Sequence, residues 1–124
     1  MIHRIDGEIF AVGVLDLTPQ TMSSVYAFYD PKYEFLSPGT LLALREIEYI
    51  KKVKKEIDPK FKFYYMGYYF QDCKKSVYKG NFKPSQVACP HTSNFVYLTD
   101  AVRQMIDIEK KPKLFEQVRA LVES

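Results

Sequence analysis

The sequence predicts an α/β protein with a mixed sheet, one long central helix and C-terminal helices. Apolar stretches at residues 2–5 and 8–17 flank Asp6-Gly7, a dipeptide that favours a type I′ hairpin turn. Residues 40–57 repeat Leu and Ile at three- to four-residue steps, which is the period of a helix. Residues 61–70, FKFYYMGYYF, are too aromatic for an ordinary helix and are typical of a buried strand.

Composition indicates one ordinary globular domain over residues 1–124, because 47% of the chain is apolar and 27% is charged. No apolar run approaches the roughly 18 residues that span a bilayer, and the N-terminus has no signal-peptide core. We therefore expect an intracellular protein, cytoplasmic and with the nucleus left open. Cys73 and Cys89 are far apart and form no CxxC pair, so we expect free thiols and no metal site or bound cofactor.

The third strand is predicted at residues 22–29 and ends at Asp30-Pro31, an ordinary turn signal. Asp16 falls near the end of the strand before it. A carboxylate there either caps a loop or holds a charge at the rim of a cleft.

Ser37-Pro38-Gly39-Thr40 opens the long helix. Ser37 is predicted as the N-cap, Pro38 fits the first helical position, and Gly39 lets a ligand approach the backbone. Free amides at the start of a helix suit an anion such as a phosphate. The alternative is that these residues only begin the helix.

The long helix is predicted to pack by one apolar stripe and to expose a basic face. Residues 45–83 hold 11 basic and 5 acidic residues, a net charge of +6, together with most of the aromatic residues that follow the helix. Cations and aromatic rings suit a single-stranded nucleic-acid end, whereas the alternative is a solvated lysine face beside an aromatic core. The stripe is Leu44, Ile47, Ile50, Val53 and Ile57, and the basic face carries Arg45, Glu48, Lys51, Lys52 and Lys55.

The rest of the chain is predicted as a loop, a short extended piece and two helices. Residues 71–81 are polar, with turn signals, and hold Lys74, Lys75, Tyr78 and Lys79. Residues 82–90 are an extended piece. Thr99 or Asp100 caps a helix over 101–109, and Pro112 starts a last helix whose inward residues are Leu114, Phe115, Val118, Leu121 and Val122.

The wording of three segments resembles the C-terminal domain of arginyl-tRNA protein transferases over residues 3–90. The segments contain SSVYAFYDP at 23–31, YEFLSPG running to ALREI at 33–47, and MGYYF through YKG to CP at 66–90. A related bacterial branch that moves leucine shares the YDP, Ser-x-Gly-Thr and Lys-x-x-Tyr-Lys elements. The order of elements is similar to the acetyltransferase-like (GNAT) fold, in which a loop and a helix start hold a pyrophosphate.

The resemblance implies an aminoacyltransferase of the N-degron pathway. It would move arginine from Arg-tRNA to the N-terminal amine of proteins that begin with Asp or Glu, the reaction called protein arginylation. The family's N-terminal cysteine-rich half is missing from this sequence, so we expect a fragment, a split protein or a shortened relative. Lys74-Lys75-Ser76 stands where the family usually has Pro, Lys and Met after the Cys.

Two alternatives to an enzyme of this kind remain open. The chain could be a module that binds tRNA or a degron and is inactive without the missing half, supplied in cis or in trans. It could also be a GNAT N-acetyltransferase, although its loop has one glycine where a loop for CoA usually shows two.

Candidate residues follow from the chemistry of aminoacyl transfer. Ser37, Gly39 and Thr40 would hold the 3′ end of the tRNA, and Arg45, Lys51, Lys52 and Lys55 would follow its acceptor backbone. Lys75 and Lys79 would neutralise the acidic side chain of the acceptor protein. Asp16 or Asp30 would bind the ammonium of the acceptor or take its proton, and Tyr68 or Tyr78 would donate to the oxyanion. Each also has an ordinary structural interpretation as a turn, a core aromatic or an exposed bend.

Overall fold

The computed structural model describes residues 1–89, 92–108 and 118–123, which form an α/β fold, as predicted. The chain divides into two compact units, Met1–Tyr64 and Tyr65–Glu123. Among the described residues, no helix combines the length and the apolar character that crossing a membrane requires.

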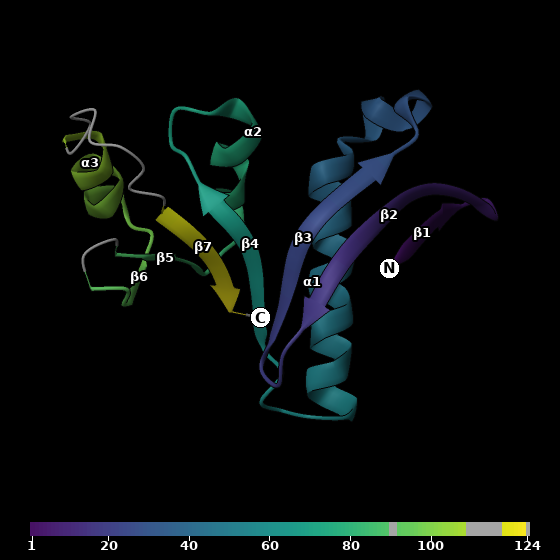
Figure 1. The fold of residues 1–124 in the computed structure, drawn as a ribbon, viewed down its shortest axis with the longest axis horizontal. Helices are drawn as coiled ribbons and strands as arrows, with labels where there is room; N and C mark the ends of the chain where they lie inside the picture. Colours follow the sequence, from purple (N-terminus) through teal and green to yellow (C-terminus); the bar gives the residue numbers. More distant parts are fainter. Residues whose placement is uncertain (90–91, 109–117, 124) are drawn as a thin grey trace. The chain divides into compact units, whose positions relative to one another are not determined.

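The first unit is built on three antiparallel strands in the order β1-β2-β3 (Figure 1). They are β1 (Ile2–Ile5), β2 (Glu8–Leu17) and β3 (Thr21–Tyr29). The β1–β2 turn has φ 51° at Asp6 and φ 84° at Gly7, and two positive φ values in succession are what a type I′ turn requires. The predicted hairpin and third strand are confirmed.

The link from β3 to the long helix is itself helical. A 3₁₀ helix, η1 (Pro31–Leu36), comes first, and α1 (Pro38–Glu56) follows. Ser37 lies between them in the left-handed region, with φ 51° and ψ 63°, and its side chain makes no capping bond. Its prediction as a side-chain N-cap is wrong, because an N-cap needs extended backbone whereas Ser37 also ends η1, donating its amide to the Glu34 carbonyl.

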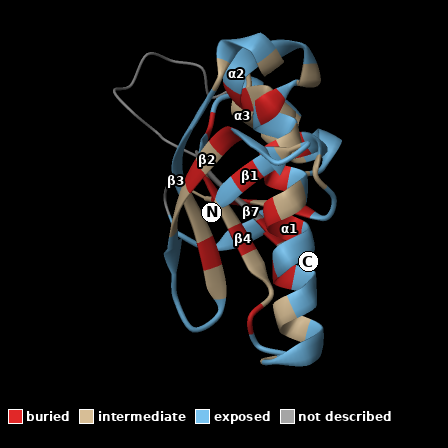
Figure 2. Ribbon diagram, turned by 90° about the vertical axis from the view of Figure 1, so that its right-hand side faces the viewer, coloured by how far each residue is buried: buried red, intermediate tan, exposed pale blue. Residues whose placement is uncertain are grey.

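Helix α1 packs on the strands along a stripe that differs from the predicted one. Ile47 and Ile50 are buried as predicted, but Leu44 is 52% and Ile57 77% exposed. The buried stripe begins instead at Leu42 and Ala43 and runs through Glu46, and Figure 2 shows its red residues along one side of the helix. Leu44 is two residues from both Leu42 and Glu46, about 200° around the helix, so it faces solvent.

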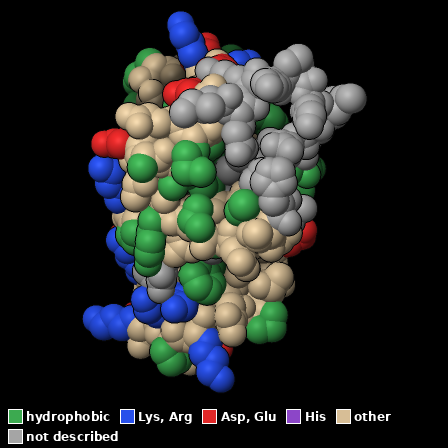
Figure 3. All heavy atoms as spheres, turned by 90° about the vertical axis from the view of Figure 1, so that its left-hand side faces the viewer, with side chains coloured by type: hydrophobic (Ala, Val, Ile, Leu, Met, Phe, Trp, Pro, Cys, Tyr) green, Lys and Arg blue, Asp and Glu red, His purple; other side chains and the backbone are tan. Residues whose placement is uncertain are grey.

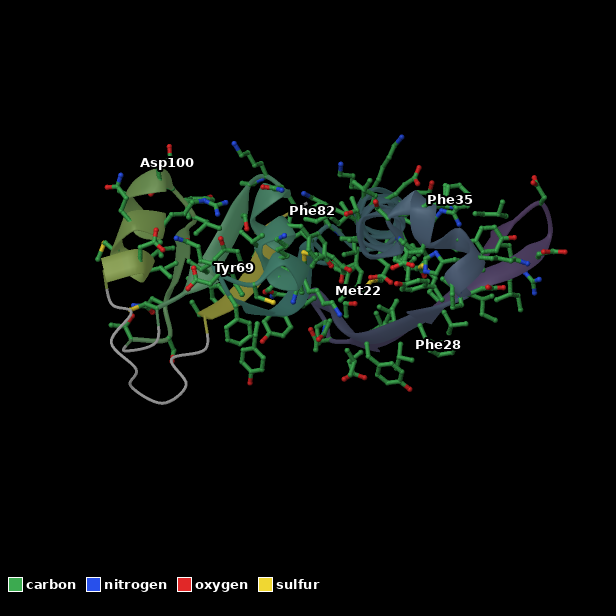
Figure 4. The ribbon with its side chains drawn as sticks, turned by 90° about the horizontal axis from the view of Figure 1, so that it is seen from above. Met22, Phe28, Phe35, Tyr69, Phe82 and Asp100 are labelled. Carbon is green, nitrogen blue, oxygen red and sulfur yellow. The ribbon has the colours of Figure 1, made fainter. Side chains whose placement is uncertain are left out.

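Apolar side chains are also exposed on the strands of the first unit. Tyr26 and Phe28 of β3 are 58% and 57% exposed, and Figure 4 shows Phe28 on the face of the strands away from α1. The core on the helix side is formed by Phe10, Ala11 and Leu42. Figure 3 shows a further group of hydrophobic side chains on one face of the molecule.

The second unit begins within β4 (Phe63–Tyr69), the aromatic strand that the sequence predicts. Gly67 has φ 75°, a conformation that few other residues adopt. Residues 71–81 were expected to be a loop, but they contain two helical turns, α2 (Lys74–Val77) and η2 (Tyr78–Asn81). They are helical because backbone and side chains tie them to the end of β4, as the next subsection describes.

Three strands and a helix complete the second unit. β5 (Ser85–Ala88) is the predicted extended piece, and it pairs antiparallel with β6 (Phe95–Tyr97), which was not predicted. The predicted helix is α3 (Asp100–Ile108), and Thr99 caps it by accepting the amide of Val102.

The predicted last helix is wrong over residues 118–123. These residues form β7 (Val118–Glu123), which pairs with β5 so that Val122 faces Ser85. Pairing with a strand more than 30 residues earlier decides the structure here, although Val118, Leu121 and Val122 also fit a helical spacing. The other two inward residues of that prediction, Leu114 and Phe115, lie outside the described residues.

Candidate functional site

The exposed face of α1 is a row of lysines. Lys51, Lys52 and Lys55 are all exposed, as predicted for a surface that could follow a polyanion. Arg45 differs from them, because its Nη1 donates to the Arg4 carbonyl at 3.3 Å and its guanidinium lies 5.2 Å from the centre of the Phe10 ring. Arg45 therefore links α1 to β1 and β2 instead of standing free on the basic face.

The start of α1 offers fewer free amides than the sequence suggests. The amides of Thr40 and Leu41 both donate to the Ser37 carbonyl, at 3.0 and 3.1 Å, and Pro38 has no amide hydrogen. Of the first residues of the helix, this leaves the amide of Gly39, which is exposed, as the candidate donor to a ligand. A phosphate here would meet one amide and the helix dipole, not a row of amides.

The two candidate carboxylates have different surroundings. Asp16 is exposed near the end of β2, where it pairs with Ser23 of β3. Asp30 caps η1 by accepting the amide of Lys32 at 3.0 Å, and its other oxygen lies 3.5 Å from the Lys32 ammonium. The structure therefore gives Asp30 a local structural task and leaves Asp16 accessible.

In the second unit, residues 74–81 form what we call the lysine turn, and hydrogen bonds attach it to the end of β4. Ser76 is buried, and its hydroxyl accepts the amide of Phe70 at 2.9 Å and donates to the carbonyl of Tyr68 at 3.2 Å. Lys79 Nζ donates to the same Tyr68 carbonyl at 2.8 Å. The turn thus has a fixed position relative to the strand end, and Lys75 is exposed on it.

This contact fixes the position of the Lys79 ammonium but occupies only one of its N–H donors. Burial lowers the pKa of its ammonium below the usual 10.5, so holding the charge in this place has a cost. An ammonium has three N–H donors, and the Tyr68 carbonyl takes one of them. The other two N–H donors can form charge-assisted hydrogen bonds to a carboxylate, which would offset the desolvation of the ammonium.

Tyr68 lies near the end of β4, and Tyr78 lies within the lysine turn. Tyr68 is 41% exposed and its ring lies against Phe70 at 6.3 Å between ring centres. Tyr78 begins η2 and presents its ring to the edge of Phe82. The structure thus joins the backbone of Tyr68 to the ammonium of Lys79.

Sequence reasoning missed Arg103 and Tyr69. Arg103 comes from α3, and its Nη1 donates to the Tyr69 hydroxyl at 2.6 Å while its Nη2 donates to the Gly80 carbonyl at 3.1 Å. Figure 4 shows Tyr69 among the side chains of this unit. No local signal in the sequence indicated Arg103, because its partners come from β4 and the lysine turn, 34 and 23 residues earlier in the chain.

A second buried polar cluster in the first unit was also missed. The Tyr64 hydroxyl donates to Glu46 Oε2, and Glu46 Oε1 lies 3.8 Å from His3 Nε2, with both side chains almost wholly buried. Burial raises the pKa of the Glu46 carboxyl above its usual 4.5 and lowers the pKa of the His3 imidazole below 6.5. Both shifts favour neutral groups, so this cluster is a structural part of the core. An acid between Ala43 and Ile50 on an apolar stripe was its signal.

No metal site accompanies these clusters in the part of the chain that the structure describes, where no three His, Cys, Asp or Glu side chains gather. Neither Cys73 nor Cys89 is in a disulfide bond.

Comparison with known proteins decides the family. The family described as "Arginine-tRNA-protein transferase, C terminus" matches residues 1–89, which include α1 and the lysine turn. The chain belongs to this family.

Relatives of this arginine-tRNA-protein transferase family match most of the chain. It is 45% identical to the arginyl-tRNA–protein transferase 1 of Drosophila melanogaster, over 95% of this chain and 24% of the relative. For the protein of the same name in Dictyostelium discoideum, the identity is 39% over 94% of this chain and 22% of the relative. An aspartate/glutamate leucyltransferase of Pseudomonas fluorescens is 36% identical over 68% of this chain and 33% of the relative.

The chain spans about a quarter of the length of the arginyl-tRNA–protein transferases that it matches. Lys79, Tyr68 and Glu46 lie within the stretch that the family description covers, and Arg103 lies beyond it. The bacterial leucyltransferases belong to the same range of relatives, so the donor amino acid needs a test of its own.

Proposed function

We propose that this chain takes part in moving arginine from Arg-tRNA to the N-terminal amine of proteins that begin with Asp or Glu. The family match over residues 1–89 carries the proposal, because it contains both the basic helix and the lysine turn. The names of the relatives support each half: some are arginyl-tRNA–protein transferases, and others are aspartate/glutamate leucyltransferases.

The reaction needs no covalent intermediate on the protein. The amine nitrogen attacks the ester carbonyl, a C–N bond forms, and the C–O bond to the ribose breaks. The amine loses a proton, and the ribose oxygen gains one. Holding the amine and the ester together can supply roughly 7 to 11 kcal/mol of the barrier, so no strong nucleophile is required.

In this proposal, the first unit binds the tRNA. Lys51, Lys52 and Lys55 are exposed on α1 and would contact phosphates without regard to sequence. The Gly39 amide, with Ser37 and Thr40 beside it, would meet the 3′-terminal phosphate or adenosine. Arg45 would support these contacts indirectly, by fixing α1 on its strands.

The second unit binds the acceptor protein in this proposal. Lys79 would direct its two remaining N–H donors to the acidic side chain of the first residue, and the exposed Lys75 would add to the field. The hydroxyl of Tyr68 or Tyr78 would donate to the oxyanion. Of the two candidate carboxylates, which both belong to the first unit, Asp16 suits the role of proton acceptor better than Asp30, since Asp30 already bonds to Lys32.

We further propose a GNAT-like topology, no resident cofactor, and action inside the cell in the cytoplasm or nucleus. The order of a hairpin, a strand, a turn, a long helix and an aromatic strand supports the topology. Aminoacyl-tRNA supplies an activated ester, so the reaction needs no further activating group.

A transfer assay tests the proposal. The chain is incubated with Arg-tRNA labelled in the arginine and with peptides that begin with Asp, Glu or Ala, and a parallel reaction uses labelled Leu-tRNA. Arginine on the Asp and Glu peptides, and not on the Ala peptide, supports the proposal. Leucine on them instead would change the donor. Binding of tRNA or of the acidic peptide without transfer would make the chain a binding module.

A further inference from the structure

Arg103 is the link between α3 and the lysine turn. Its guanidinium makes two hydrogen bonds, to the Tyr69 hydroxyl and to the Gly80 carbonyl, and it lies 5.9 Å from the centre of the Tyr69 ring. The Gln71 side chain donates to the carbonyl of Arg103 itself at 3.1 Å. The strand, the lysine turn and α3 are therefore joined at a single side chain.

Gly80 makes this close approach possible. A Cβ placed on Gly80 would lie 2.7 Å from Arg103 Nη2 and 2.7 Å from Leu98 Cδ2, distances at which something must move. Gly80 is buried, and its φ is not positive, so the glycine is needed for space and not for backbone conformation. The guanidinium fits where a larger residue would displace it.

Lys79 lies between two fixed points. On one side, its ammonium and the Ser76 hydroxyl share the Tyr68 carbonyl. On the other side, the next residue, Gly80, is held by Arg103. A lysine side chain normally loses considerable rotamer entropy when it is fixed. Here that entropy is lost on folding, so it does not oppose the binding of a ligand.

We infer that Arg103 is a positioning residue that orients Lys79 to read the acidic first side chain of the acceptor protein. This inference rests on the proposed function and adds α3, outside the matched stretch of residues 1–89, to the acceptor-binding device. The guanidinium also places a second basic group beside the lysine turn.

The inference predicts a loss of selectivity, not only of stability. We measure the binding of two fluorescent peptides that differ only in a first residue of Asp or Asn, so that shape is kept and charge is lost. Arg103→Met is expected to weaken binding of the Asp peptide about tenfold, to leave binding of the Asn peptide unchanged, and to leave the tRNA affinity unchanged. Gln104→Ala, an exposed change on the same helix, is the matched control and should alter neither peptide.

A double variant separates positioning from direct contact. If Arg103 acts through Lys79, then Lys79→Met with Arg103→Met binds the Asp peptide no more weakly than Lys79→Met alone. Independent, additive losses would overturn the inference. Arg103→Lys, which keeps the charge but not the fork of donors, is expected to restore only part of the selectivity.

Two further results keep the inference open to refutation. Should Arg103→Met fail to fold by circular dichroism, Tyr69→Phe removes one of the two acceptors without changing charge, and it is expected to lower selectivity for Asp by a smaller factor. An unchanged selectivity in a folded Arg103→Met or Tyr69→Phe variant overturns the inference alone. If the unaltered chain neither binds nor modifies the Asp peptide, the proposed function fails instead.

Discussion

Each unit of the chain contains a cluster of polar side chains in its interior, and the two clusters differ in the kind of groups that they contain. In the first unit, Glu46, Tyr64 and His3 form a cluster whose groups are driven toward neutrality by burial. In the second unit, the basic side chains of Arg103 and Lys79 donate to a hydroxyl and to backbone carbonyls.

This difference suggests a structural role for the cluster in the first unit and a ligand-binding role for the cluster in the second. A cluster of neutral groups attracts a charged ligand only weakly. It fixes α1 on its strands, and its contribution to stability depends on pH. The second cluster instead contains two cationic side chains whose printed hydrogen-bond partners are uncharged, a hydroxyl and backbone carbonyls. Under the proposed function, the second unit is therefore where we expect the carboxylate of the acceptor protein to bind, whereas the tRNA phosphates would contact the lysines of α1.

The largest effect is expected from Lys79. Under the proposed function, Lys79→Met would remove a charge-assisted hydrogen bond to the acceptor carboxylate, an expected loss of about 1.5 to 3 kcal/mol, or roughly ten- to a hundredfold in affinity for an Asp peptide. Lys75→Met is the control, because Lys75 is exposed and has only a diffuse effect. Titration of a fluorescent peptide measures both, and equal losses would refute the special role of Lys79.

The neutral cluster is expected to appear in stability and not in binding. Tyr64→Phe removes the hydroxyl that donates to the buried Glu46 carboxyl, which should lower the free energy of unfolding by about 1 to 3 kcal/mol. Tyr68→Phe, at an exposed position, should change it by less than about 0.5 kcal/mol. Urea unfolding followed by fluorescence measures the two, and similar values would contradict the contrast between the units.

The buried cluster of the first unit is expected to make stability depend on pH. Because burial raises the folded-state pKa of Glu46, the folded chain holds a proton that the unfolded chain releases above pH 4.5. This contribution is complete below pH 4.5 and is lost as pH rises through the folded-state pKa. Burial of His3 acts the other way and adds stability as pH rises toward 6.5.

Glu46→Gln isolates the first of these contributions. The variant keeps His3, so the difference in unfolding free energy between it and the unaltered chain should shift in favour of the variant as pH rises above 4.5. Urea unfolding at pH 4 to 8 measures this difference. A constant difference over that range would mean that Glu46 titrates normally.

The smallest effect is expected from single lysines on α1. Lys52→Gln should weaken tRNA binding equally for all tRNA sequences, and should reduce the slope of log K against log salt by about 0.7 to 0.9. Glu48→Gln, on the same helix and also exposed, is the control and should not reduce the slope. A filter-binding series from low to high salt measures the slope, and an unchanged slope would remove Lys52 from the interface.

Local signals predicted much of the first unit correctly. Asp6-Gly7 specified the hairpin because the two residues accept positive φ, and Pro38 marked the start of α1 within its first turn. The position of α1 around its axis could not be read in the same way. Leu44 and Leu42 both extend a helical stripe through Ile50, and contact with β2 and β3 chooses between them.

Long-range pairing accounts for the errors in the second unit. Residues 118–123 form a strand because they pair with β5, and the sequence of the segment does not indicate this distant partner. Lys79 could be named as a candidate from charge alone, but its partner carbonyl is 11 residues away and Arg103 lies 23 residues beyond Gly80. Sequence reasoning therefore found the cation and missed the residues that hold it.

The left-handed backbone at Ser37 has a practical consequence for anyone who wishes to crystallise or label this chain. Serine is uncommon at φ 51°, whereas asparagine tolerates that region well. Ser37→Asn should therefore raise the melting temperature while leaving the Gly39 amide in place. A more heat-resistant chain with unaltered tRNA affinity would be a better starting material for the experiments above.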